Sequence, residues 1–441
     1  MSTALQTPAH AASAAMRSFA AQWQARPRDP LFPVRERALQ RFLALGLPTT
    51  HDETWRYTNL RSLAAQSFVD APRRSRGEIE QHASLALLDR TAASLLVVNG
   101  YPILPADDLI GVEIRSLRDM AQTEPQALSR FLEPGSDADL QRWSLLNTAL
   151  YVDGLYVKIT APLAEPLMIL HLATADGADS IAYPRIIIDL APGTAATVIE
   201  QHIAPGGHTP VSNSDTHIAL GRDAHLEHYR VFATDAGATH LDSLTIRQRR
   251  GSRCRQFTVA LGGGLVRAGL EAHLDEPGAA LDSYSLLVGC DERHIDCVNV
   301  VTHGAPETRS TQTARAIAGG SSRVIFNSKV IVDAGAVHAE SQQSFRGLLM
   351  SPTAEIDSRP QLEIHADEVK CAHGATTGRL DPDMLFYMLS RGLDRETAQS
   401  LLVFAFLSDV LTGMSVPSAR AAIENALIPQ LPDPQILRKF R

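Results

Sequence analysis

The sequence predicts a mainly β protein whose β-rich centre lies between two helical end regions. From about residue 155 to residue 369, short β-rich runs alternate with turn residues such as Gly and Pro. Before about residue 150 and after Leu380, the chain is instead rich in helix-forming residues. No segment between the expected strands is long or periodic enough for a crossover helix, which argues against a doubly wound α/β sheet.

The central region holds more expected strands than one immunoglobulin-like sandwich contains. A β-solenoid grows by stacking coils and tolerates such a count. Short glycine-containing segments at 191–194 and 333–337 suit the tight corners of coils. Because no strict hexapeptide repeat is present, the pattern alone leaves a sandwich, a barrel and a β-solenoid open.

The N-terminal region, residues 1–150, is predicted to be a mostly helical domain. Helices are expected at 11–24 and 34–47, and the three prolines between these ranges break the helical segment in two. Apolar runs at 93–98 and 110–117 predict a few strands. The β core is then expected to span residues 151–378.

The C-terminal region, residues 379–441, is predicted to form three helices. Asp381 is a good N-cap with proline at the first helical position, and Gly392 ends that helix. Asp394 is expected to cap the second helix, and the third is expected at 418–427. About 60 residues bury little surface alone, so we expect these helices to dock on the β core or on another chain.

The second C-terminal helix is expected to continue to about Thr412. Its centre, residues 401–407, is apolar on every side. A helix of this kind is either fully buried or covered by a partner on its second face. The same run is too short to cross a bilayer.

Composition excludes several functional classes. The 441-residue chain has a net charge of -8 and a pI near 6.1, which argues against a nucleic-acid partner because phosphate binding needs a basic field. No apolar run is long enough for a membrane span, and the start lacks the features of a secretory signal. The four cysteines form no C-x-x-C pair, so a reducing, cytoplasmic location is expected. No phosphate-binding loop is visible, which predicts that the chain does not hydrolyse ATP.

Cys371 and His373 are the strongest candidates for chemistry. In an extended segment their i, i+2 spacing places both side chains on one side. Lys370 and the following helix N-terminus are expected to lower the pKa of the thiol. A thiolate beside an imidazole can accept sulfur, bind a soft metal or act as a nucleophile. Since two ligands do not make a stable tetrahedral site, another chain would have to supply the rest.

The remaining cysteines and histidines are interpreted as structural. Cys290 and Cys297 have a spacing that zinc knuckles do not use, and Cys254 lies in an expected strand. Twelve of the sixteen histidines lie between His202 and His373, which raises the question of a metal site. However, neighbours such as 225 and 228 point to opposite faces of a strand, so core or surface roles are favoured.

Sequence motifs then give a resemblance. The C-terminal third resembles the SufB/SufD family of iron–sulfur cluster assembly proteins, and residues 360–378 are the most specific part. Near the start, ETWRYT at 53–58 resembles a motif of the SufD branch, which His373 also favours. The acceptor cysteine of the SufB branch has no match among Cys254, Cys290 and Cys297. The other matching motifs lie at 302–303, 308–310, 324–329, 332–336, 342–343, 348–351, 354–357, 386–387 and 390–392.

The resemblance implies a right-handed parallel β-helix between helical end domains. It also implies a non-catalytic scaffold that pairs with SufB and binds the SufC ATPase, with Cys371 and His373 at the SufB joint. There they would handle iron, sulfide or a nascent Fe–S cluster transiently, and the chain alone would bind no cofactor stably. Whether a flavin joins the complex, or the isolated chain forms a homodimer, is left open. Contacts to SufC are expected from Asp381, Phe386, Tyr387, Arg391, Leu402 and Phe406.

Two other functions fit the expected fold. The groove of a β-helix can host a carbohydrate-active enzyme, which needs clustered carboxylates or calcium. Glu355 and Asp357 could share a face, but they fall inside a family motif. A stand-alone metal-binding protein with His and Cys ligands is the third reading, and it predicts metal in the isolated chain.

Overall fold

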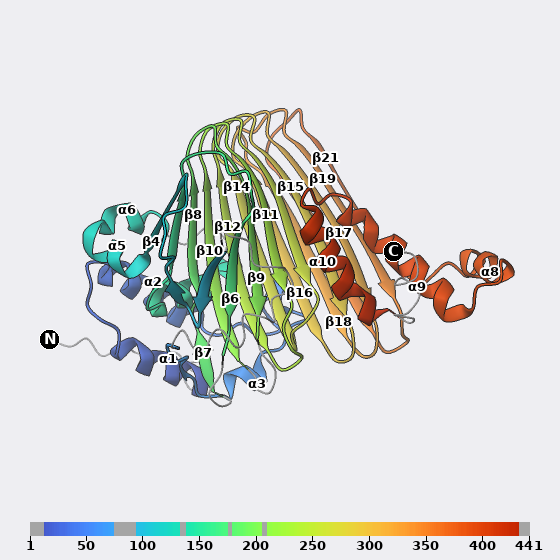
Figure 1. Ribbon diagram of the computed structural model, residues 1–441, viewed down its shortest axis with the longest axis horizontal. Coiled ribbons are helices and arrows are strands. Elements are labelled where there is room, and N and C mark those ends of the chain that lie inside the picture. The colour runs from blue at the N-terminus through green and yellow to red at the C-terminus, as the bar shows by residue number, and fades with distance from the viewer. Residues whose placement is uncertain (1–12, 75–93, 133–137, 175–178, 205–209, 432–441) are drawn as a thin grey trace.

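The computed structural model describes residues 13–74, 94–132, 138–174, 179–204 and 210–431. Its centre is a solenoid in which the chain alternates between two sheets, so that each strand pairs in parallel with the strand two places further on (Figure 1). Within the described residues, this alternation from β8 to β21 gives seven coils. The predicted mainly β class and the β-helix are confirmed, and the sandwich and barrel alternatives are wrong.

We name the two sheets A and B. Sheet A contains β4 (Val112–Ser116), β5 (Leu155–Ile159), β8 (Arg185–Leu190), β10 (Val211–Leu220), β12 (Thr239–Gln248), β14 (Leu265–Leu274), β16 (His294–His303), β18 (Arg323–Val332) and β20 (Glu355–Ile364), with β1 (Val69–Asp70) and β7 (Ser180–Ala182) beside it. Sheet B contains β2 (Ser94–Val98), β3 (Tyr101–Ile103), β6 (Leu167–Leu172), β9 (Ala195–Ile203), β11 (His225–Phe232), β13 (Arg253–Ala260), β15 (Ala280–Gly289), β17 (Arg309–Ala318), β19 (Glu340–Leu349) and β21 (Lys370–Gly378).

Successive coils stack in register, which builds the core from columns of equivalent side chains. Thr216 pairs with Leu244 and Leu244 with Leu270, so one coil takes 28 residues and the next 26. Alternate residues of each strand point into the solenoid. The columns near the starts and near the ends of the strands are apolar. The varying coil length explains why no short repeat is visible in the sequence.

The N-terminal helices cover the outer face of sheet A. They are α1 (Ala14–Gln24), α2 (Phe32–Leu45), α3 (Arg61–Ala64), α5 (Leu117–Thr123), α6 (Pro125–Ser129) and α7 (Ala138–Leu150). Their apolar sides form one cluster with outward residues of sheet A, such as Ile187 and Leu241. Strands β2 to β4 of this region extend the two sheets, so residues 94–116 share the solenoid's hydrogen-bond network.

The ETWRYT segment fixes the N-terminal region to sheet A. Its first half is the 3₁₀ turn Glu53–Trp55, and Trp55 is only 1% exposed. The Arg267 guanidinium lies 4.1 Å from the centroid of the Trp55 ring and pairs with the buried Asp296. Thr58 donates a hydrogen bond to the same carboxylate. In this chain the motif therefore acts as an anchor between two parts of the fold.

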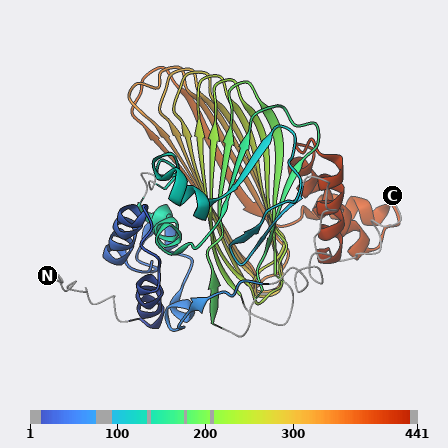
Figure 2. The same ribbon diagram turned by 60° about the vertical axis from the view of Figure 1, so that its left-hand side comes forward.

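The C-terminal helices are α8 (Pro382–Ser390), α9 (Arg395–Leu411) and α10 (Pro417–Leu427), as the sequence predicts. Asp381 and Asp394 cap α8 and α9 through side-chain hydrogen bonds to backbone amides. Helices α9 and α10 pack on the outer face of sheet B, whereas α8 projects beyond the solenoid. Figure 2 shows the N-terminal and C-terminal helices on opposite sides of the solenoid.

Some element boundaries differ from the expected ones. The first helix begins at Ala14, and the expected residues 11 and 12 lie outside the described part of the chain. The second helix is Phe32–Leu45 rather than 34–47, and β4 is shorter than the expected 110–117. No strand was predicted at residues 309–318, which form β17. Among the described residues, no helix is long and apolar enough to span a membrane.

Candidate functional site

The solenoid ends in an uncovered coil formed by β20 and β21. Each of these strands pairs with a neighbour on one side only, β20 with β18 and β21 with β19. Equivalent positions in the preceding coils are mostly buried, but β21 is exposed along nearly its whole length. A long strand with an unpaired edge is a template for pairing with another chain. Nothing among the described residues blocks this end.

Cys371 and His373 lie together on this last coil. Cys371 is in register with Ser341, and His373 with Gln343. Both partners are buried inside the solenoid, so the two side chains share the side of β21 that faces the solenoid interior, which is uncovered at this last coil. Cys371 is half-buried against the core, whereas His373 is exposed. The expected placement on one side of an extended segment therefore agrees with this strand geometry.

The expected lowering of the Cys371 pKa is wrong. Burial raises the pKa of this thiol, and the opposing hydrogen bond from Ser341 is weaker. The Lys370 ammonium lies 3.2 Å from a Glu340 carboxylate oxygen, so its positive charge is paired with that carboxylate. The helix on which the prediction relied begins only at Pro382. The thiol of the isolated chain is therefore held in its neutral form at neutral pH.

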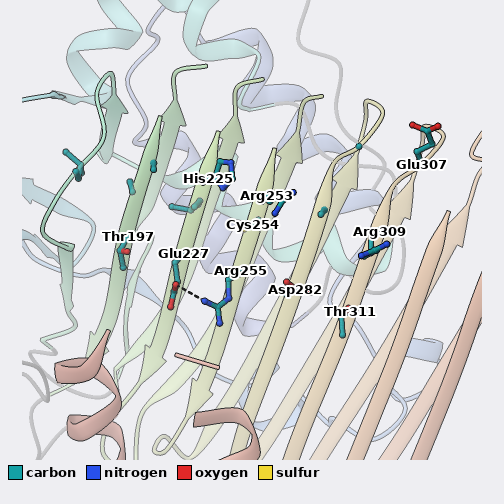
Figure 3. A pocket seen from close by; sticks show the side chains of 16 residues that line it. Thr197, His225, Glu227, Arg253, Cys254, Arg255, Asp282, Glu307, Arg309 and Thr311 are labelled. Carbon is teal, nitrogen blue, oxygen red and sulfur yellow. Dashed lines mark hydrogen bonds and ion pairs between the residues drawn. The ribbon is translucent and has the colours of Figure 1, made fainter. Parts of the chain in front are cut away.

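A groove runs along the outer face of sheet B toward this site. Its larger hollow, of about 860 Å³, is shown in Figure 3, where side chains of β9 to β17 line up across neighbouring strands. A second hollow of about 530 Å³ shares Arg309 and Thr311 with the first and is lined by Cys371. Arg309 and Lys370, which both contact Glu340, line this second hollow. The second hollow is therefore a charged depression on the outer face of sheet B, whereas the Cys371 side chain packs against the core inside the solenoid.

Three carboxylates line the larger hollow, those of Glu227, Asp282 and Glu307, and neighbouring residues engage the first of them. Glu227 forms an ion pair with Arg255, drawn as a dashed line in Figure 3, and accepts hydrogen bonds from Ser415 and Tyr229. These contacts tie the C-terminal segment to sheet B. Glu355 and Asp357 also lie elsewhere, on the outer face of sheet A, where both contact Arg323. Their role is thus consistent with strand stabilisation.

Two of the residues expected to contact an ATPase, Phe386 and Tyr387, form an exposed aromatic surface on α8. Phe386 is 72% exposed and Tyr387 58%, with the Arg391 guanidinium 5.1 Å from the centroid of the Tyr387 ring. Asp381 uses its carboxylate to cap the helix. Leu402 and Phe406 on α9 are half-buried, while the opposite side of α9 packs on sheet B.

The other cysteines have the structural positions expected of them. All four are free. Cys254 and Cys297 are buried in the solenoid, and burial raises the pKa of Cys297 to about 11. Cys290 is half-buried and lies 3.5 Å from the Gln430 side-chain oxygen, next to the C-terminal helices.

Two groups of polar residues were not singled out by sequence reasoning. One is the charged line of Arg309, Glu340 and Lys370, which was missed because β17 was missed. The other is a buried cluster of histidines with Glu200 inside the solenoid. Only knowledge of the coil length would have shown that His171 and His202 stack, since they are 31 residues apart in the chain.

Comparison with known proteins gives matches over most of the chain. A family model described as the SufBD core domain of SUF system FeS cluster assembly matches residues 171–406, and one for the SufBD protein N-terminal region matches 18–167. The chain is 29% identical to the iron-sulfur cluster assembly protein SufD of Escherichia coli (strain K12) over 386 residues, 86% of this chain and 88% of that protein. It is 27% identical to the iron-sulfur cluster assembly SufBD family protein slr0076 of Synechocystis, covering 87% of both. It is 24% identical to the chloroplastic protein ABCI7 of Arabidopsis thaliana, covering 87% of this chain and 82% of that protein.

Proposed function

Because the chain belongs to the SufBD family of SUF-system iron–sulfur cluster assembly proteins, we propose that it is a non-catalytic scaffold subunit of a cytoplasmic assembly complex. It pairs with a SufB-type paralogue through the open end of its solenoid and binds the SufC ATPase through its C-terminal helices. The observation that carries this proposal is the uncovered last coil, which presents Cys371 and His373 at an unpaired strand edge.

At this joint the two side chains would act on iron and sulfide as substrates. A thiolate and an imidazole are both ligands for iron, but they leave a tetrahedral site incomplete. The paralogue would supply the remaining ligands. Iron must also displace the thiol proton, and burial raises the pKa of Cys371. We therefore expect the isolated chain to hold iron poorly at this pair.

The exposed face of α8 supports the second contact. A helix with two large, exposed aromatic residues and little other packing is typical of a protein-binding surface. Its neighbour α9 is fixed to sheet B through buried residues such as Val403 and Leu407. Movement of an ATPase bound to α8 would thus be transmitted to the solenoid.

The joint is tested by co-expressing the chain with its SufB-type paralogue and SufC. We expect Cys371→Ala and His373→Ala to form complexes of unchanged mass whose rate of cluster formation falls about tenfold or more, because each loses one ligand. Ala372→Ser, on the opposite side of the same strand, is the matched control and should keep the wild-type rate.

Two outcomes separate the parts of this proposal. If both ligand variants assemble clusters at the wild-type rate, Cys371 and His373 have no role in assembly. If the co-expressed chains do not associate at all, the scaffold proposal itself is wrong. The native mass of the chain expressed alone shows in addition whether the open end pairs with a second copy.

The ATPase contact is tested by the double variant Phe386→Ser/Tyr387→Ser. Both side chains are exposed, so we expect the free energy of unfolding to change by no more than about 0.5 kcal/mol. SufC should no longer co-purify with the variant. Leu104→Ser removes an apolar side chain that is 45% exposed from the N-terminal region and should leave SufC binding intact. Retention of SufC by the double variant would contradict the assignment.

A further inference from the structure

A cluster of ionisable side chains fills the inside of the solenoid near β6, β9 and β11. His171 and His202 are neighbours on adjacent strands, and their rings stack 4.3 Å apart. Glu200 lies two residues before His202 on the same inward side of β9. All three residues are at most 4% exposed. Their potential ligand atoms lie within 4.8 Å of one another.

The glutamate is held from several directions. One carboxylate oxygen is 2.9 Å from His171 Nε2 and accepts a hydrogen bond from Thr216, and the other is 2.8 Å from His228 Nε2. The carboxylate is thus fixed between two imidazoles, in the arrangement by which outer residues orient a metal-ligating carboxylate.

Several imidazole nitrogens in this cluster have no hydrogen-bond partner among the described residues. They are His202 Nε2, His171 Nδ1, His228 Nδ1 and both ring nitrogens of His240. His202 Nε2 comes no closer than 4.0 Å to its nearest carboxylate, that of Asp242. Buried polar groups are rarely left unpaired. A set of orphaned nitrogens at one place therefore indicates a missing ligand.

The donor atoms select the kind of ligand. Asp242 is engaged by Arg230 and Ser214, which leaves His171, Glu200 and His202 as the donors. Two imidazoles with one carboxylate suit Fe²⁺ or Zn²⁺ better than Ca²⁺ or Mg²⁺.

We propose that His171, Glu200 and His202 form a buried site for a divalent first-row transition metal ion of the Fe²⁺–Zn²⁺ class. His228 and Thr216 orient the carboxylate through hydrogen bonds, and His240, whose ring centroid is 5.9 Å from that of His202, would supply a fourth ligand. The ion would be resident inside the solenoid and separate from the Cys371–His373 pair. This inference does not depend on the proposed assembly function, and it replaces the expectation that the chain alone holds no metal stably.

The site is tested on the full-length chain, expressed without a polyhistidine tag in medium containing equal amounts of Fe²⁺ and Zn²⁺, under anaerobic conditions. After dialysis against a chelator, elemental analysis is expected to find about one ion per chain, because buried ligands exchange slowly. X-ray absorption at the edge of that metal should show nitrogen and oxygen ligands at roughly 2.0–2.2 Å and no sulfur. This spectrum requires no variant.

Variants locate the ion. His202→Phe keeps an aromatic ring beside His171 and Phe232, and Glu200→Gln keeps the side-chain size, so each removes mainly a ligand atom. We expect retained metal to fall about tenfold or more in both. His303→Gln is the matched control, because this histidine is equally buried but both of its ring nitrogens face hydroxyl groups at 2.8 Å.

Cys371→Ala is the second control and should retain the ion in full. Less than about 0.1 ion per wild-type chain after chelation would overturn the proposal, since a structural site retains its metal. Sulfur ligation, or loss of the ion from Cys371→Ala, would equally overturn it by placing the metal at the open end. If His202→Phe fails to fold, the wild-type absorption spectrum and Glu200→Gln still decide between these results.

Discussion

Replacing Asp296 with alanine is expected to lower the free energy of unfolding by about 3–5 kcal/mol, because it leaves a buried arginine without its counter-ion. Asp296 is 1% exposed and Arg267 3%, and the two form an ion pair under the N-terminal region. The variant also removes the acceptor of the Thr58 hydroxyl. Since Arg267 stacks on Trp55, the N-terminal region should detach from sheet A first.

Chemical unfolding followed by two signals measures this effect. All three tryptophans, at positions 23, 55 and 143, belong to the N-terminal region, so tryptophan fluorescence reports its detachment while circular dichroism reports the solenoid. We expect the fluorescence midpoint to move to lower denaturant further than the dichroism midpoint. A shared transition that moves by less than about 1 kcal/mol would show that the pair contributes no more than an exposed one.

Two further variants test the physical reason. In Arg267→Met/Asp296→Leu neither charge is left unpaired, so we expect this double variant to be more stable than Asp296→Ala. Asp275→Ala breaks an ion pair with Arg247 whose side chains are 35% and 52% exposed. It should cost at most about 1 kcal/mol because solvent screens such pairs.

Replacing Phe257 with alanine is expected to cost about 3–5 kcal/mol, as truncation of fully buried aromatic residues does. Phe257 is 0% exposed and lies between Tyr229 and Tyr284 in a column of rings on the outer face of sheet B, at centroid distances of 4.8 and 4.7 Å. This column is part of the surface on which α9 and α10 pack. Its loss should therefore loosen the C-terminal helices as well as the sheet.

Thermal unfolding gives the loss of stability, and limited proteolysis shows where it occurs. We expect cleavage of Phe257→Ala to begin in the C-terminal helices under conditions in which the wild-type chain is intact. Phe257→Leu keeps apolar volume and should lose mainly the ring stacking, about 0.5–1.5 kcal/mol per pair. Unchanged protease resistance of the alanine variant would contradict a role of the column in holding the helices.

Local chemistry made the C-terminal helices predictable. The N-caps Asp381 and Asp394 and the positive-φ Gly392 fix helix ends through contacts within a few residues. The strands were harder. β17 has the sequence RSTQTARAIA, which contains no aromatic residue and only one large apolar residue, Ile317. It is a strand because β15 and β19 provide backbone partners on both sides.

The candidate site was predictable in part. The spacing of Cys371 and His373 placed them on one side of an extended segment, which is a property of adjacent residues. The pKa of the thiol was predicted in the wrong direction: burial raises it, and the Lys370 charge that was expected to lower it pairs with Glu340 from the preceding coil. That contact joins residues 30 positions apart, and no local pattern reveals it.

The sequence by itself determined the mainly β class, the capped starts of α8 and α9 and the family, because strand propensity, caps and motif residues act over a few neighbouring positions. Tertiary structure alone decided which side chains share a column of the solenoid. Coils of 28 and 26 residues follow one another, so the sequence has no fixed repeat length that would reveal the columns. It also decided that the last coil is left open and that His171, Glu200 and His202 meet inside, because both depend on how coils stack rather than on what any one coil contains.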